Sequence, residues 1–189
     1  EISFLKDQGL IEINTSGMNV TKIGEEIVDK LNSFIHEVKG LSDMEKEIKE
    51  KLSLKDVIIV SGDVDTNPSV LKDIGKAASN YLKKIIKNNS IIALTGGSSV
   101  KEVVEAFEGV RNISNVLVVP ARGGMGRNVE VQGNTLVASL AKKVNGTYKM
   151  LHVPEDASLE ILNSLKQEKS IKQVVESIHH ADIFLYGVG

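Results

Sequence analysis

The chain has 189 residues and a formal net charge of −2, so no overall positive charge attracts it to nucleic acid or to a membrane surface. It contains no cysteine, which excludes disulfides, thiolate catalysis and cysteine-bound zinc, and we expect a cytoplasmic protein. Aromatic residues make up only 4%, which disfavours stacking platforms for single-stranded nucleic acid, and no apolar run approaches the ~20 residues of a membrane span.

The first thirty residues predict the end of a helix, a short hairpin and the start of a second helix. Gly9 is placed to end the first helix, and residues 14–17 predict a turn between two short alternating stretches. Thr21 is a candidate N-cap for the helix that follows. This order is typical of the wing of a winged-helix domain, although any small hairpin has the same pattern.

Residues 22–52 predict a long helical region with an apolar seam. The seam follows heptad-like spacing, which is typical of coiled coils, through Ile27, Leu31, Phe34, Val38, Leu41, Ile48 and Leu52. Gly40 and the capping-box pattern of Ser42 and Glu45 predict a break near residues 40–42. The seam fits a helix that packs on its own domain as well as one that pairs with another chain.

From residue 54 onward, candidate strands and helices alternate. We expect strands over residues 57–60, 91–94, 116–119, 148–153 and 183–186, and helices over 70–86, 99–108, 134–143, 157–164 and 170–179. The alternation predicts an α/β fold with a doubly wound, mostly parallel sheet. Ligands of such sheets bind beyond the carboxyl ends of the strands.

Two glycine-rich turns lie at that end of the predicted sheet. The first, TGGSSV at residues 95–100, links a strand to a helix, so its amides and hydroxyls suit an anion such as phosphate. The second, PARGGMG at residues 120–126, contains Arg122, which can bind phosphate or carboxylate through two parallel hydrogen bonds. Neither turn is a P-loop or a G-x-G-x-x-G motif, so a phosphorylated small molecule is favoured over a nucleotide. The glycines of the first turn could also serve only a tight turn that needs a positive φ, and Arg122 could be merely solvated.

Other polar residues are weaker candidates. Asp63 and Asp65 could bind a metal or act as acid and base, but their Asp-x-Asp spacing before an Asn-Pro pair favours an ordinary turn. Adjacent helical residues such as His179 and His180 do not share a face, which disfavours chelation. No histidine or carboxylate is identifiably paired with a serine, so we expect no catalytic triad.

Two residues lie at the predicted start of the helix over residues 134–143. Asn134 is a candidate N-cap, and Gln132 could form a hydrogen bond with a sugar hydroxyl. Spacing alone does not decide either role.

These segments together resemble the effector domain of SorC-family transcriptional regulators. The similarity includes both glycine-rich turns, VQGN at residues 131–134 and ADIFLYGVG at residues 181–189. FLKDQGLI at residues 4–11 and GMNVT at residues 17–21 resemble the tail and wing of that family's DNA-binding domain. The resemblance covers nearly the whole chain and is strongest to the members that regulate glycolytic genes.

The resemblance implies a repressor whose effector domain has a Rossmann-like fold related to sugar-phosphate isomerases. The implied inducer is a phosphorylated sugar, fructose-1,6-bisphosphate for the glycolytic members, which is bound without turnover. The implied partners are operator DNA and further copies of the chain in a dimer or tetramer. We expect no catalytic residue, metal site or cofactor. The implied ligand site consists of Gly96, Gly97, Ser98, Ser99, Arg122, Gly123, Gly124 and Gln132.

We therefore divide the chain into three parts. Residues 1–31 would be the C-terminal part of a winged-helix DNA-binding domain, residues 32–52 a linker and oligomerisation helix, and residues 53–189 the N-terminal part of a sugar-phosphate effector domain. The resemblance also implies further ligand residues beyond residue 189, so we expect a fragment of a longer protein.

Two alternatives remain. The first is a sugar-phosphate isomerase or deaminase on the same fold, but Asp63, Asp65 and Glu130, its nearby carboxylates, have no clear acid–base partner in the sequence. The second is a purely structural oligomerisation domain, which would bind no anion at residues 95–99.

Overall fold

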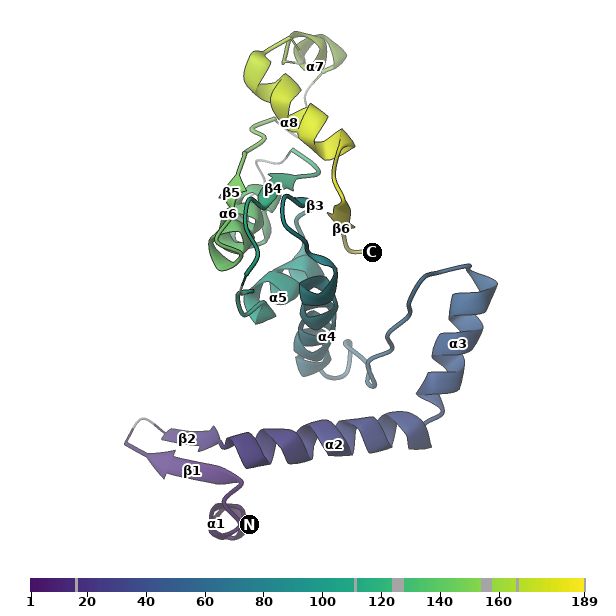
Figure 1. Ribbon diagram of the computed structural model, residues 1–189, viewed down its shortest axis with the longest axis vertical. Helices are drawn as coiled ribbons and strands as arrows, with labels where there is room; N and C mark the ends of the chain where they lie inside the picture. Colours follow the sequence, from purple (N-terminus) through teal and green to yellow (C-terminus); the bar gives the residue numbers. More distant parts are fainter. Residues whose placement is uncertain (16, 111, 124–127, 154–157, 166, 189) are drawn as a thin grey trace. The chain divides into compact units, whose positions relative to one another are not determined.

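A computed structural model describes the chain except for residues 16, 111, 124–127, 154–157, 166 and 189 (Figure 1). It divides into two compact units, Glu1–Ser61 and Gly62–Gly189, which we describe separately. Within the described residues, no helix combines the length and the apolar character that crossing a membrane requires.

The first unit begins with a helix and a hairpin, as predicted. Helix α1 spans Ile2–Asp7, and strands β1 (Ile11–Asn14) and β2 (Gly17–Val20) pair in antiparallel orientation. Gly9 has a φ of 69°, in the left-handed region that ends many helices. The helix, the hairpin and the glycine between them are therefore confirmed.

Two helices follow, and they are separated where the sequence predicts a break. Helix α2 spans Lys22–Val38 and α3 spans Leu41–Lys51. Gly40 between them has a φ of 65°, a conformation that favours glycine. At the other end of α2, the Thr21 hydroxyl accepts a hydrogen bond from the Gly24 amide at 3.2 Å, which confirms the predicted N-cap.

The capping box predicted at Ser42 and Glu45 does not form. Helix α3 begins two residues earlier than a cap at Ser42 would place it, with Gly40 at the N-cap position. The Glu45 Oε1 atom instead lies 3.0 Å from His36 Nε2 and accepts a hydrogen bond of 2.7 Å from the Ile59 amide. Ser42 Oγ lies 3.2 Å from His36 Nδ1. Both side chains thus connect α3 to neighbouring segments of the same unit.

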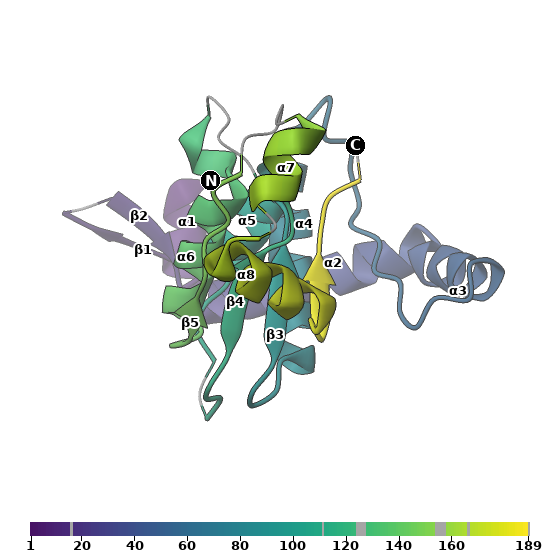
Figure 2. The same ribbon diagram turned by 90° about the horizontal axis from the view of Figure 1, so that it is seen from above.

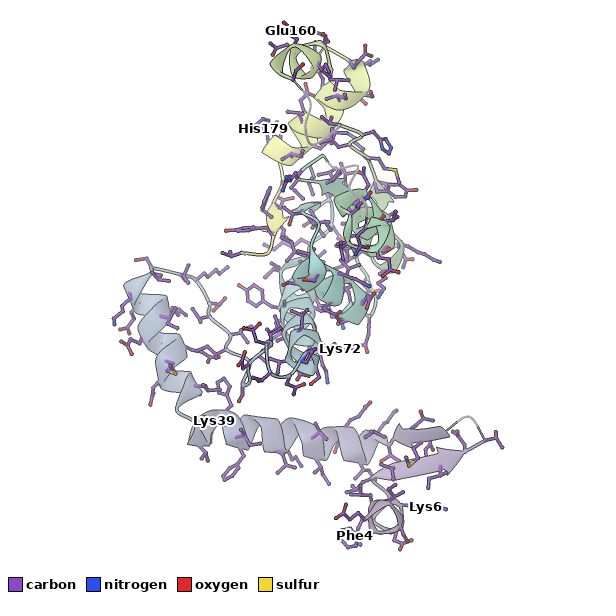
Figure 3. The ribbon with its side chains drawn as sticks, turned by 180° about the vertical axis from the view of Figure 1, so that it is seen from behind. Phe4, Lys6, Lys39, Lys72, Glu160 and His179 are labelled. Carbon is purple, nitrogen blue, oxygen red and sulfur yellow. The ribbon has the colours of Figure 1, made fainter. Side chains whose placement is uncertain are left out.

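The strand predicted over residues 57–60 is also absent from the described structure. No described strand pairs with this segment, and the Ile59 amide is used by the Glu45 carboxylate. Lys39, at the junction of α2 and α3 in Figure 3, donates a hydrogen bond of 2.7 Å to the Ser61 hydroxyl. Side-chain contacts with the two helices therefore replace backbone pairing here.

The apolar seam of α2 faces outward. Ile27, Leu31, Phe34 and Val38 are all exposed, with Phe34 63% accessible. These side chains do not contribute to a buried core in the described chain, and they remain available to another surface.

The second unit is a parallel α/β sheet with helices on both faces. Its strands are β3 (Ile91–Leu94), β4 (Leu117–Pro120), β5 (Thr147–Tyr148) and β6 (Ile183–Leu185), in the order β5-β4-β3-β6. All three pairings are parallel, which confirms the predicted doubly wound, mostly parallel sheet.

The helices that cover this sheet are α4 (Ser69–Ile85), α5 (Ser98–Ala106), α6 (Gly133–Lys143), α7 (Leu159–Leu165) and α8 (Lys169–His179). Helices α4, α5 and α6 lie on one side of β3 and β4, whereas α8 packs across the other side (Figure 2). A short 3-10 helix, η1 (Val129–Val131), precedes α6. The core between sheet and helices is apolar and, apart from Phe107, the members named here are aliphatic, as is usual for parallel strands covered on both faces. It includes Ile92, Leu94, Val100, Val104, Phe107, Val118, Val137 and Leu140.

Strand β5 is shorter than the predicted strand over residues 148–153. Its residues in register with β4 are Thr147 and Tyr148, and the Lys149 amide donates a last hydrogen bond of 3.2 Å to the Val118 carbonyl. Farther along, the Asn134 side chain forms two hydrogen bonds with the backbone of Leu151. Its Oδ1 accepts from the Leu151 amide at 3.0 Å, and its Nδ2 donates to the Leu151 carbonyl at 3.1 Å. The predicted N-cap role of Asn134 is therefore wrong, since Gln132 holds that position.

Candidate ligand-binding site

The two glycine-rich turns begin side by side at the carboxyl ends of β3 and β4. Leu94 and Pro120 are register partners at the ends of these strands. The Ala121 amide donates to the Leu94 carbonyl at 2.7 Å, and the Thr95 amide donates to the Leu185 carbonyl of β6 at 3.0 Å. The sheet therefore aligns the starts of both turns beyond the same edge.

A cavity of about 450 Å³ opens between these turns and the start of α6. Among the residues predicted for the ligand site, Gly96, Gly97, Arg122, Gly123 and Gln132 line it. The other described lining residues are Thr95, Asn128, Val131, Gly133 and Gly187. The predicted residue Gly124 lies outside the described residues.

The backbone of the first turn lies against the segment before α6. A Cβ atom on Gly96 would lie 2.5 Å from the Val131 carbonyl oxygen, which is too close for any side chain. The Gly97 amide donates to the same oxygen at 2.9 Å, and Gly97 has a φ of 123°. Glycine therefore serves close approach at position 96 and an unusual backbone conformation at position 97.

Ser98 and Ser99 are the first residues of α5, with Gly97 at the N-cap position. Ser98 is exposed and Ser99 is half-buried. They do not belong to the described lining of the cavity, but a Cβ atom on the lining residue Gly187 would be 3.8 Å from Ser99 Cβ. Both serines thus lie beside the cavity, where the first amides of a helix have no acceptor within it.

A second helix begins at the same cavity. Gln132 is the N-cap residue of α6 and Gly133 its first residue. A Cβ atom on Gly133 would lie 3.5 Å from the Gly96 amide nitrogen and 3.7 Å from the Arg122 carbonyl oxygen. The positive ends of the α5 and α6 dipoles therefore converge here, which favours an anionic ligand.

The charge of the lining has the same sign. Arg122 contributes a guanidinium group, and none of the described residues that line the cavity carries a carboxylate. Arginine binds phosphate and carboxylate through a fork of N–H groups. The cavity is consequently suited to a polar anion with several acceptor oxygens.

An ion pair joins two segments next to the cavity. Lys101 Nζ lies 2.9 Å from Glu130 Oε2 and 3.6 Å from Glu105 Oε1. The hydrogen bond and charge of Lys101 hold the pKa of Glu130 below its ordinary value, and the same interactions raise the pKa of Lys101. Glu130 is therefore a paired carboxylate, a role that gives no support to an acid–base function.

The weaker candidates have structural roles. Asp63 Oδ1 accepts from the Asp65 amide at 3.0 Å, and the Asp63 carbonyl accepts from Thr66 Oγ1 and the Asn67 amide, which confirms a turn. His179 ends α8 (Figure 3). In the part of the chain that the structure describes, no three His, Cys, Asp or Glu side chains group as metal ligands.

Sequence inspection missed two residues of this region. Asn128 lines the cavity, and Lys101 forms an ion pair beside it with Glu130, which is 29 residues away in the sequence. Neither residue belongs to a motif, and only the packing of η1 against α5 brings them to the site.

Comparison with known protein families divides the chain at residue 35. The profile of the sugar-binding domain family matches residues 36–189, and the profile described as CggR N-terminal DNA binding domain matches residues 1–35.

Two curated relatives match over the full chain. The central glycolytic genes regulator of Bacillus subtilis is 41% identical over 189 residues, which are 100% of this chain and 56% of the relative. The regulator of the same name from Priestia megaterium is 39% identical over 190 residues, with the same coverage. The chain thus spans a little over half the length of these relatives.

Solved structures have the same fold. A SorC family transcriptional regulator from Enterococcus faecalis superposes with a TM-score of 0.69 at 38% identity, covering 78% of this chain and 60% of that one. The full-length sorbitol operon regulator SorC from Klebsiella pneumoniae gives a TM-score of 0.71 at 19% identity, covering 97% and 54%. The second likeness concerns the fold alone.

Proposed function

We propose that the chain, which belongs to the SorC family of transcriptional regulators and matches its sugar-binding domain over residues 36–189, is part of a repressor of glycolytic genes induced by a phosphorylated sugar. We propose fructose-1,6-bisphosphate as that sugar. The observation that carries the proposal is the cavity beyond β3 and β4, where two helix N-termini and Arg122 converge without a carboxylate among the described lining residues.

One phosphate would bind at the first turn. The amide of Gly96 and the hydroxyls of Ser98 and Ser99 would donate hydrogen bonds to its oxygens, aided by the α5 dipole, whereas the Gly97 amide already donates to the Val131 carbonyl and Gly97 would only line the site. The support for this assignment is that Ser98 and Ser99 start α5 beside the cavity that the two glycines line.

The second turn would bind the other charged end of the ligand. Arg122 and the amides of Gly123 and Gly124 would contact it, and Gln132 would contact a sugar hydroxyl. Hydrogen bonds to charged groups contribute about 1.5–3 kcal/mol each, so a bisphosphate would gain more from this cavity than a neutral sugar.

Induction would follow from a shift in population. The sugar phosphate would stabilise one arrangement of the oligomer and operator DNA another, so each ligand would weaken the binding of the other. We keep the proposed division into residues 1–31, 32–52 and 53–189, with the first part contacting DNA. A regulator of this kind would act in the cytoplasm.

The exposed seam of α2 supports a homo-oligomer. Leu31 and Phe34 lie three residues apart on a helix whose apolar side chains follow heptad-like spacing, and both are exposed. We propose that a second copy of the chain covers this seam, in a dimer or tetramer.

The test is calorimetric titration of the full-length protein with fructose-1,6-bisphosphate, with fructose as the uncharged control. We expect saturable binding of the bisphosphate, none of fructose at the same concentration, and release of operator DNA on binding. Absence of bisphosphate binding would overturn the proposal. Conversion of the sugar phosphate, followed by NMR, would support an isomerase or deaminase instead.

A further inference from the structure

An ion pair between side chains connects the start of α5 to η1, the two segments that form facing walls of the cavity. Lys101 lies in the first turns of α5, where its amide donates to the Gly97 carbonyl at 2.9 Å. Its Nζ atom lies 2.9 Å from Glu130, which belongs to η1 and precedes Gln132 by two residues. The pair therefore joins the wall formed by Gly97 and the start of α5 to the wall formed by η1 and Gln132.

The same two walls share a backbone hydrogen bond. The Gly97 amide donates to the Val131 carbonyl at 2.9 Å, and Val131 follows Glu130 directly. Val131 and Gln132 are the two residues after Glu130. Any movement of η1 away from α5 would therefore lengthen the bond between the Gly97 amide and the Val131 carbonyl, and it would displace Gln132. The ion pair thus lies where it can control the spacing of the walls.

Lys101 has a second acceptor within its own helix. Glu105 lies four residues along α5, with its Oε1 atom 3.6 Å from Lys101 Nζ. The distance from Lys101 to Glu130 is shorter, and the hydrogen bond with Glu130 is the largest cause of the raised pKa of Lys101. Lys101 therefore interacts mainly with η1. The Lys101 side chain is 26% exposed and the Glu130 side chain 76%, so solvent screens the pair, chiefly from the Glu130 side.

We propose that Lys101 is a positioning residue for the sugar-phosphate site, acting through its ion pair with Glu130 to fix η1 against the start of α5. Lys101 itself does not line the cavity in the described structure. The effect of the Lys101–Glu130 pair on ligand affinity rests on the proposed function, whereas its effect on the position of η1 does not.

The signs of two substitutions distinguish positioning from a general effect of charge. Lys101→Met removes a positive charge near an anion site, whereas Glu130→Gln removes a negative one. If Lys101 and Glu130 acted only through their electrostatic fields, the first substitution would weaken anion binding and the second would strengthen it. Positioning predicts that both weaken it, because either substitution releases η1.

The binding experiment uses calorimetric titration of the full-length protein with fructose-1,6-bisphosphate. We expect Lys101→Met and Glu130→Gln each to raise Kd about two- to fivefold, the scale of a partly exposed ion pair, and the double variant to raise it no further than a single one. Glu105→Gln is the matched control and should leave Kd unchanged. Opposite changes for the two single variants, or no change, would overturn the positioning role.

A second readout needs no ligand. Hydrogen exchange of peptides that cover residues 95–98 should accelerate about two- to fivefold in Lys101→Met and Glu130→Gln, because the Gly97 amide loses protection when η1 moves. Peptides from β4, and Glu105→Gln throughout, should exchange as in the wild type. Unchanged exchange at residues 95–98 would refute the inference. If the wild type binds no sugar phosphate, the proposed function fails and this measurement still decides the role of Lys101.

Discussion

Gly96 and Val131 are in such close contact that a Cβ atom on Gly96 would lie 2.5 Å from the Val131 carbonyl oxygen. Backbone surrounds this position on another side as well, with the Gly133 nitrogen 3.1 Å from the same Cβ position. Because both neighbours are backbone atoms, a change of side-chain rotamer cannot relieve the clash. The distance between the cavity walls therefore depends on glycine at position 96.

The Gly96→Ala variant should accordingly be destabilised. Forcing an extra carbon into a packed site typically costs about 1–3 kcal/mol, and here the cost comes from moving η1 away from α5. Urea unfolding of the chain measures the change. Gly133→Ala is the control, since its Cβ would lie 3.5 Å from the nearest atom and should change stability by no more than about 1 kcal/mol. Equal stability of the two variants would contradict the close packing at Gly96.

Arg122→Ala should weaken sugar-phosphate binding at least tenfold. The loss of charge-assisted hydrogen bonds costs about 1.5–3 kcal/mol, and every 1.4 kcal/mol is a factor of ten in Kd. Arg122→Lys, which keeps the charge but not the fork of donors, should bind with intermediate affinity. Titration calorimetry measures both variants. A Kd equal to that of the wild type in Arg122→Ala would remove this residue from the ligand site.

Asn134→Ala should destabilise the second unit. Its side chain makes two hydrogen bonds with the Leu151 backbone, and each contributes about 0.5–1.5 kcal/mol. The loss should appear as a lower urea midpoint. Asn80→Ala, on an exposed position of α4, serves as the control and should leave the midpoint unchanged or slightly raised. If both variants unfold alike, the contact between α6 and residue 151 contributes no stability.

The carboxyl group of Glu130 should titrate at a lower pH in the wild type than in Lys101→Met. The hydrogen bond and charge of Lys101 lower the pKa of Glu130, so the pair contributes stability above the ordinary Glu pKa and loses it as the pH falls through the folded-state value. NMR titration of the side-chain carboxyl carbons measures the midpoints. Identical midpoints in the two proteins would show that the pair does not form in solution.

Phe34→Glu should reduce self-association of the full-length protein. A charge in an apolar helix seam is unfavourable to bury, and two copies would also repel each other across it. Sedimentation velocity should show a smaller species than the wild type forms. Lys30→Gln, at an exposed position on the same helix, changes the net charge by the same amount and is the control. Unchanged sedimentation would place the oligomer contact elsewhere.

Much of the fold follows from short-range pattern in the sequence. Gly40 separates α2 from α3, and Asp63 forms a turn, because the preferences of glycine and aspartate act within a few residues. The strands β3 and β4 and the glycine-rich turns after them are also visible as apolar runs followed by TGGSSV and PARGGMG. Parallel pairing then requires that both turns meet at one edge of the sheet.

Contacts between distant segments decided the rest. Asn134 binds the backbone of Leu151 instead of capping α6, and the Ile59 amide binds Glu45 instead of a neighbouring strand. Lys101 Nζ lies closer to Glu130 than to Glu105, although Glu105 is nearer in sequence, because η1 packs against α5. Local sequence patterns therefore predict the order of the helices and of the paired strands β3 to β6, and the chemistry of the turns. Which side chains join the cavity walls was settled only by tertiary structure, since hydrogen bonds and ion pairs depend on distances that local preference does not set.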